Sequence, residues 1–123
     1  MTKGQIEDTI TKRVVKFYFD TIGIGPEKAK TYILEDMIIV RFKGHLLPIE
    51  QKLLHGNKGI ELVKKIHQSI HELTIKESAH IIGEITQQTV IGTHSDTSTK
   101  SGEIIQIFIL KNNYQKILDM VGS

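Results

Sequence analysis

The sequence predicts an α+β fold in which two αββ units form a four-stranded antiparallel sheet with helices on one face. Two segments with apolar residues at helical spacing are each followed by a pair of runs rich in β-branched residues. A chain of 123 residues is long enough to bury a core without disulfide or metal staples. We therefore expect a single α+β domain over residues 1–123.

The first unit begins with an amphipathic helix over about residues 4–22. Its apolar positions recur every three or four residues, at Ile6, Ile10, Val14 and Phe17. Gly23 tolerates the left-handed geometry that ends helices, and Pro26 disfavours helix at the residue before it. The helix is therefore expected to stop at this point.

A hairpin is expected to follow this helix. Residues 31–34 and 37–42 are rich in β-branched and aromatic side chains, and only Glu35 and Asp36 separate them. The acidic pair lacks the glycine that a type I′ turn favours, so the pattern leaves the turn type open.

The second unit is predicted to start with a short helix and a long one. Pro48 suits the first turn of a short helix, and Gly56 stops it. From Gly59, apolar residues at helical spacing continue as far as Ile85 and predict a long amphipathic helix.

A second hairpin and a final helix complete the pattern. Residues 89–94 and 103–110 are the strand candidates, and the segment 95–102 between them is rich in turn-forming residues. Either Asn112 or Asn113 could cap a final short helix.

The strand candidate 103–110 is apolar on both faces. Side chains alternate across a strand, so Ile105, Ile107 and Ile109 point one way, and Ile104, Phe108 and Leu110 point the other. An antiparallel sheet commonly keeps one face wet. This strand therefore predicts a partner on the second face, and we expect a homodimer. In the alternative, the terminal helix covers that face and gives a closed monomer.

Composition excludes several classes of function. The net charge is only +2 and no block of basic residues occurs, so we expect no nucleic-acid partner. The absence of cysteine removes thiolate nucleophiles, cysteine-ligated zinc and iron–sulfur clusters. No apolar run reaches the roughly 18–20 residues of a spanning helix, and the polar start does not suggest a signal peptide. We expect a cytoplasmic protein without direct membrane insertion.

Two histidines on the long helix are candidate metal ligands. His67 and His71 lie four residues apart, so both imidazoles share one helix face. Gln68 stands where the HExxH motif requires glutamate, and no third ligand is evident. The default alternative is two solvated or half-buried histidines, and we expect neither metal nor cofactor.

No catalytic residue is predicted. His94, Ser95 and Asp96 are the three side-chain types of a hydrolytic triad, but neighbours in a strand point to opposite faces. Glu35 and Asp36 lie at an expected hairpin tip, where exposed carboxylates stay ionised. An enzyme would need a pocket with convergent titratable groups, so the sequence favours a protein that is not an enzyme.

A small-anion site is the ligand-binding candidate. The glycine pair at Gly23 and Gly25 precedes two amines, and a flexible backbone beside ammonium groups can hold an anion. The alternative is a helix stop followed by an ordinary charged strand. With the polar segment of the second hairpin, the candidate ligand-binding residues are Lys28, Lys30, Thr31, His94, Ser95, Asp96, Ser98 and Thr99.

Several motifs, in a consistent order, resemble the MpsC-like family of small bacterial proteins over about residues 4–112. They are Gly25-Pro26-x-Lys28-x-Lys30-Thr31-Tyr32-Ile33, Asp36-Met37-Ile38-Ile39-Val40, Gly44-x-Leu46-x-Pro48-Ile49-Glu50 and His94-Ser95-Asp96-x-Ser98-Thr99. Two departures are visible. Leu47 precedes Pro48 where the family often has threonine, and Gln87-Gln88 stands where a glycine is usual.

The resemblance implies a role and leaves the activity open. The family takes its name from a bacterial membrane-potential-generating, cation-linked system tied to inorganic carbon uptake. It therefore implies a non-enzymatic accessory or regulatory protein that acts with a membrane transport protein for cations or bicarbonate. The alternative is a binding protein that senses a small anion or metabolite.

Overall fold

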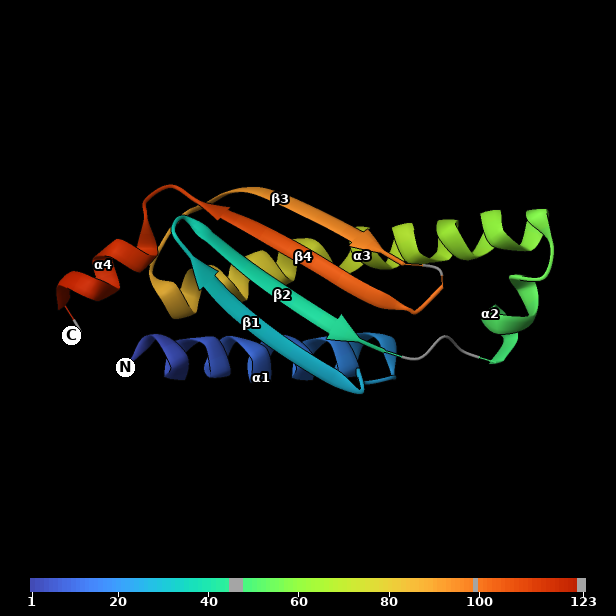
Figure 1. Ribbon diagram of the computed structural model, residues 1–123, viewed down its shortest axis with the longest axis horizontal. Helices are drawn as coiled ribbons and strands as arrows, with labels where there is room; N and C mark the ends of the chain where they lie inside the picture. Colours follow the sequence, from blue (N-terminus) through green and yellow to red (C-terminus); the bar gives the residue numbers. More distant parts are fainter. Residues whose placement is uncertain (45–47, 99, 122–123) are drawn as a thin grey trace.

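The computed structural model describes residues 1–44, 48–98 and 100–121 and confirms the predicted fold class (Figure 1). In chain order the elements are α1 (Lys3–Ile22), β1 (Lys28–Leu34), β2 (Met37–Lys43), α2 (Pro48–Leu53), α3 (Asn57–Thr86), β3 (Val90–Thr97), β4 (Glu103–Leu110) and α4 (Tyr114–Val121). The two αββ units are α1-β1-β2 and α3-β3-β4.

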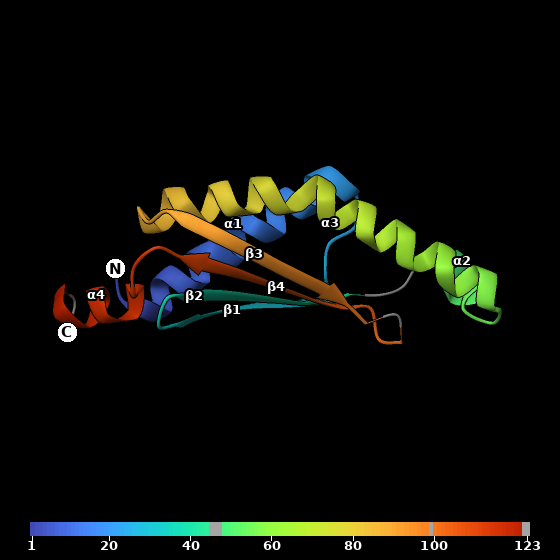
Figure 2. The same cartoon turned by 90° about the horizontal axis from the view of Figure 1, so that it is seen from above.

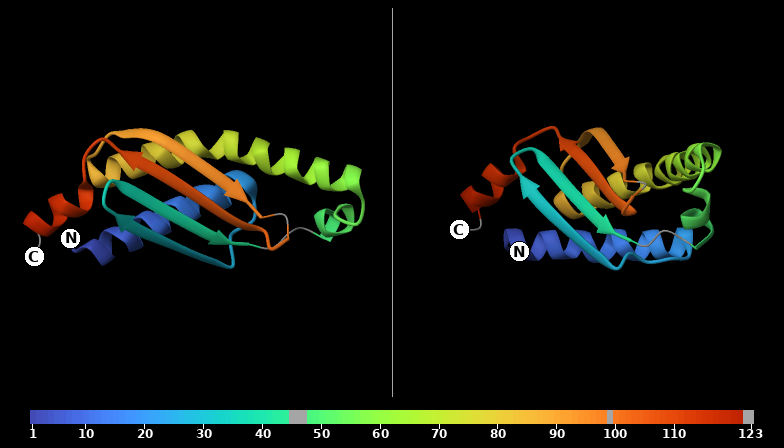
Figure 3. Two further views of the ribbon diagram at one scale, coloured as in Figure 1. Left: turned by 45° about the horizontal axis from the view of Figure 1, so that its top comes forward. Right: turned by 45° about the vertical axis from the view of Figure 1, so that its right-hand side comes forward.

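The four strands form one antiparallel sheet in the order β1-β2-β4-β3. The two hairpins therefore join through β2 and β4, which occupy the centre, while β1 and β3 form the edges (Figure 3). Figure 2 shows α1 and α3 together on one face of this sheet. The prediction of helices on a single face is confirmed.

The core lies between these two helices and the covered face of the sheet. Val14 of α1 and Ile82 of α3 pack in one fully buried cluster with Ile38 of β2 and Phe108 of β4. Alternate residues of each central strand enter this cluster, as the period of two requires. Burial of this apolar set is the main stabilising contribution to the layer arrangement.

The terminal helix α4 holds the β1–β2 turn and does not cover the second face. The turn residue Glu35 has a φ of 56°, a left-handed conformation that costs a side chain about 1 kcal/mol or more. Its N–H donates to Oε1 of Gln115 at 2.8 Å, and its carbonyl accepts from the N–H of Gln115 at 3.1 Å. Figures 1 and 2 show α4 beyond the end of the sheet, so the closed-monomer alternative is wrong.

The end of β3 differs from the expectation, and the cap of the final helix is identified. Strand β3 continues through Thr97, so residues 95–97 belong to the sheet and not to the linker. Their polar composition is typical of a turn, but their backbone pairs with β4 as far as Ile104. At the final helix, Asn113 is the cap, because its Oδ1 accepts from the N–H of Lys116 at 3.0 Å.

Within the described residues, no helix is long and apolar enough to cross a membrane.

Candidate functional site

The face of the sheet opposite the helices is apolar and open in the isolated chain. The strand register sorts its side chains into three rows across the sheet: Leu34–Met37–Ile109–Gly92, Tyr32–Ile39–Ile107–His94 and Lys30–Arg41–Ile105–Asp96. Leu34 is 48% exposed and Tyr32 is 37% exposed, and the three isoleucines of β4 are partly exposed. Exposed apolar patches on a protein often mark interaction sites. We call these three rows the open face.

Charge is distributed unevenly along the open face. The end of the sheet near the β3–β4 turn carries Lys28, Lys30 and Lys43 on β1 and β2, while Asp96 lies on β3. Arg41 is paired with Glu103 of β4, with 2.7 Å between Nη2 and Oε1. The opposite end, near the β1–β2 turn, is apolar. The open face therefore carries lysines along one edge and a single acid, Asp96, on the other edge, and it is apolar at one end.

The structure does not bring the predicted ligand-binding residues together within one chain. Lys28 and Lys30 lie on the edge strand β1, while His94 and Asp96 lie on the opposite edge strand β3. With β2 and β4 between them, the two edges are about 14 Å apart at a spacing of roughly 4.8 Å per strand. The Lys30 ammonium group lies 5.3 Å from the centre of the Tyr32 ring.

The remaining members of the predicted set have separate places. Thr31 is buried on the covered face, where its Oγ1 lies 2.7 Å from Oγ1 of Thr11. Ser95 also lies on the covered side, and Ser98 begins the β3–β4 turn by donating its N–H to the carbonyl of Glu103 at 2.9 Å. Thr99 lies outside the described residues. Whether any of these residues binds a ligand stays a prediction.

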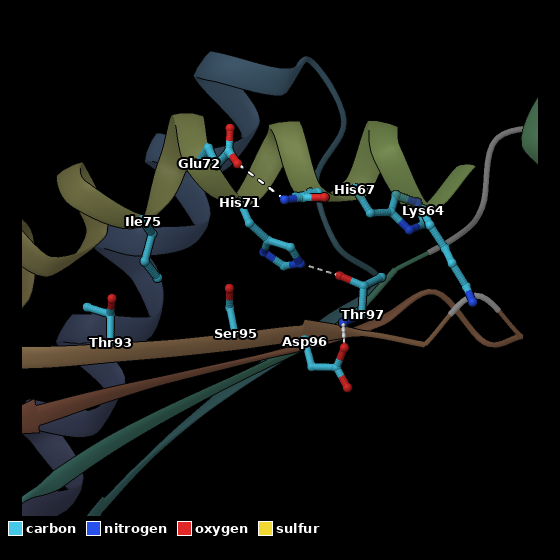
Figure 4. Close-up of a pocket in the computed structure, with 10 residues that line it drawn as sticks. Lys64, His67, His71, Glu72, Ile75, Thr93, Ser95, Asp96 and Thr97 are labelled. Carbon is cyan, nitrogen blue, oxygen red and sulfur yellow. Dashed lines mark hydrogen bonds between the residues drawn. The ribbon is translucent and has the colours of Figure 1, made fainter. Parts of the chain in front are cut away.

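A polar groove separates α3 from β3 on the covered side (Figure 4). His71 points from α3 toward β3, and its Nε2 hydrogen-bonds to Oγ1 of Thr97. Burial lowers the pKa of His71, the neighbouring His67 lowers it further, and Asp96 opposes both effects. His71 therefore favours the neutral imidazole in the folded protein.

His67 contacts a different residue, Glu50, and the sequence does not predict this pair. Its Nε2 lies 2.8 Å from Oε2 of Glu50 on α2, and both side chains are largely buried. In the sequence, Glu50 is one ordinary acid after Pro48 and Ile49, and no spacing links it to a residue 17 positions away. Among the described residues, no group of three or more histidine, cysteine or acidic side chains could hold a metal ion.

These features define a class of protein: an α+β sheet protein with a helical layer on one face and an exposed, largely apolar surface on the other. The family model described as "Na+-translocating membrane potential-generating system (MpsC)" matches residues 2–112. The chain belongs to this family, and the resemblance seen in the sequence is confirmed.

One relative supports the same assignment. "Uncharacterized protein YbcI" from Bacillus subtilis (strain 168) is 35% identical over 120 residues, which cover 98% of this chain and 97% of the relative. No solved structure matches the chain.

Proposed function

We propose that this protein is a non-enzymatic accessory or regulatory component of a Na+-translocating membrane-potential-generating system. It acts on the cytoplasmic side as a homodimer, together with a membrane transport protein for cations or bicarbonate. Family membership supports the system. The apolar open face supports the dimer and is the observation that carries this part of the proposal.

The occupant of the open face is a second copy of this chain. Burial of several hundred Å² of apolar surface at about 25 cal/mol per Å² contributes on the order of 10 kcal/mol before the costs of association. That gain is of the same order as the costs of association, so charge pairs across the interface also have to contribute. Two sheets that pack face to face form a sandwich with a core about 10 Å thick, which the open-face isoleucines are large enough to fill.

Charge selects the orientation of the two sheets. A two-fold axis parallel to the strands places β1 of one copy over β3 of the other. Lys30 then faces Asp96 of the second copy, and Lys43 faces its Glu103. A two-fold axis across the strands would instead set Lys30 against the apolar end near Leu34, where its charge would lose water without a partner. The axis along the strands is therefore favoured.

Sedimentation equilibrium at micromolar concentration tests the dimer and its orientation. The wild type is expected at twice the chain mass. Lys30→Glu and Asp96→Lys each place like charges opposite each other, so each should weaken the dimer at least about tenfold. The double variant restores opposite charges and should restore the dimer.

Lys65→Glu is the matched control, because it makes the same charge change on the exposed surface of α3. It should leave the dimer intact. A wild type that sediments as a monomer would contradict the proposed dimer. A double variant that dimerises no more tightly than the single variants would exclude the proposed orientation.

The link to the membrane system is tested by affinity purification of the tagged protein from native membranes. A membrane transport protein should be retained by the wild type and not by an unrelated tagged protein of similar size. Retention of no membrane protein above that control would contradict the accessory role.

A small-anion or metabolite sensor is the second candidate, and the sandwich favours it in one respect. In that dimer, Lys28 and Lys30 of one copy lie at the same end as His94, Asp96 and Ser98 of the other. A thermal-shift screen with bicarbonate, phosphate and nucleotides tests this function. The absence of a shift, or an equal shift in the Lys28→Ala/Lys30→Ala variant, would contradict it.

A further inference from the structure

A cavity of about 310 Å³ lies at the end of the molecule where α3 extends past the sheet and α2 packs against it (Figures 1 and 2). The end of α1, the first half of α3, α2 and the β3–β4 turn all contribute to its wall. It opens on the helical side of the sheet, because its lining includes Phe42 and Ile104 from the covered face. The cavity is therefore separate from the open face.

The wall is mainly aliphatic, and four of its large side chains reach solvent. Ile24 is 42% exposed, Ile49 65%, Leu62 48% and Ile66 38%. Single exposed aliphatic residues are ordinary on a protein surface, but four around one concavity form an apolar patch. Contact with an apolar ligand would remove this surface from water and so stabilise the complex.

One polar cluster interrupts this wall. The Glu50 carboxylate and the His67 imidazole meet there at 2.8 Å, and Nδ1 of His67 is buried with no hydrogen-bond partner among the described residues. Tyr18 lies nearby; burial raises the pKa of its hydroxyl, and the charge of Glu50 raises it further. The tyrosine therefore keeps its proton and can donate it in a hydrogen bond.

We propose that this cavity binds an uncharged, mostly apolar small molecule that carries one hydroxyl or carbonyl group. The described lining contains one carboxylate and one imidazole, and these two groups contact each other at 2.8 Å. The Tyr18 hydroxyl and Nδ1 of His67 are the groups that hydrogen-bond the polar atom of the ligand. This mixture of an apolar wall and a few polar groups is typical of small-molecule sites.

Two dyes with the same aromatic skeleton test the cavity and its charge preference. N-phenyl-1-naphthylamine is neutral, and 8-anilinonaphthalene-1-sulfonate adds one negative charge. Both fluoresce strongly when they leave water. The neutral dye is expected to bind at one site per chain and at least about tenfold more tightly than the anionic dye, because the described residues of the lining include no lysine or arginine.

Variants assign the bound dye to the cavity. Ile66→Trp fills the rim and should weaken binding of the neutral dye at least about tenfold. Leu73→Trp is the matched control on the same helix, since Leu73 is 67% exposed and lies outside the cavity lining, and it should leave binding unchanged. Ile107→Lys alters the open face and should also leave binding unchanged. Circular dichroism and melting temperature establish that each variant is folded.

Amide signals of glycines give an independent location for the dye. Gly25, Gly44 and Gly102 line the cavity, whereas Gly4 and Gly83 lie outside its lining. In a two-dimensional nitrogen–proton NMR spectrum, the neutral dye should move the signals of the first three and not those of the other two.

Three outcomes would overturn the proposal. They are no binding of the neutral dye at its solubility limit, equal or tighter binding of the anionic dye, and loss of binding in Ile107→Lys but not in Ile66→Trp. The first two outcomes do not depend on the dimer, because the cavity lies on the other side of the sheet, and the third would assign the dye to the open face instead.

Discussion

Both faces of strand β4 carry mainly apolar side chains, but their surroundings differ. Phe108 and Leu110 are buried beneath the helical layer, with exposures of 0% and 1%. Ile105, Ile107 and Ile109 point the other way and keep partial exposure, because only neighbouring strands shield them. Both faces are apolar enough to form a core.

The apolar content of a strand face shows that the face has to be buried. It does not show which element buries it. Helices α1 and α3 fill one face, and α4 is engaged at the β1–β2 turn through Gln115. The described chain has no further helix for the open face.

The first prediction compares truncation on the two faces. Phe108→Ala should lower the free energy of unfolding by about 3–5 kcal/mol, because it opens a cavity in a packed core. Ile107→Ala, at a protein concentration where the chain is monomeric, should cost about 1 kcal/mol or less, since little packed volume is lost. Urea denaturation measures both. Equal losses would mean that the open face is already packed within one chain.

The second prediction concerns protein concentration. If the open faces pair, a concentration about 100-fold above the dissociation constant stabilises the folded chain by roughly 2–3 kcal/mol by mass action. The melting temperature of the wild type should therefore rise with concentration, and that of Ile107→Lys should not. A wild-type melting temperature that stays constant across this range would argue against pairing.

The third prediction concerns a polar residue on the covered face. Gln106 is 0% exposed, and neither its Oε1 nor its Nε2 has a hydrogen-bond partner among the described residues. Gln106→Met keeps the shape and removes the cost of burying the amide, so it should raise stability by about 1–2 kcal/mol.

A matched control for this change is Thr31→Val, which breaks the hydrogen bond between the hydroxyls of Thr31 and Thr11. It should lower stability by about 1 kcal/mol, the opposite sign. Both effects are measured by urea denaturation. A loss of stability in Gln106→Met would show that the amide makes a favourable interaction in the core.

The fourth prediction is a pH dependence in the groove beside the covered face. The pKa of His71 is lowered in the folded state, chiefly by burial, so the unfolded chain binds a proton more readily. Stability should be fully present above the ordinary histidine value near about 6.5 and should fall as the pH drops through it toward the lowered value. His71→Gln should reduce this loss between neutral and mildly acidic pH. If the free energy of unfolding depends on pH in the same way in the wild type and in His71→Gln, the assignment to His71 is contradicted.

The sequence determined the helices, the hairpins and the two-sided apolar strand, because each depends on spacing between near neighbours. The periodicity of Ile6, Ile10 and Val14 was sufficient to predict α1. Asn112 and Asn113 could not be distinguished in advance, since both precede α4 and only the hydrogen bond to Lys116 separates them. The end of β3 was missed because strand pairing with β4 outweighs the turn-forming preference of Ser95 and Asp96.

Only the tertiary structure decided which face is covered and which residues meet. Strand order separates Lys30 from Asp96 by two strands, and the packing of α2 on α3 joins Glu50 to His67. These relations depend on contacts between residues distant in the sequence, and local spacing carries no information about them. The sequence thus shows which side chains have to be buried. The arrangement of the layers sets where each is buried, because a strand has two faces and the helices cover only one of them.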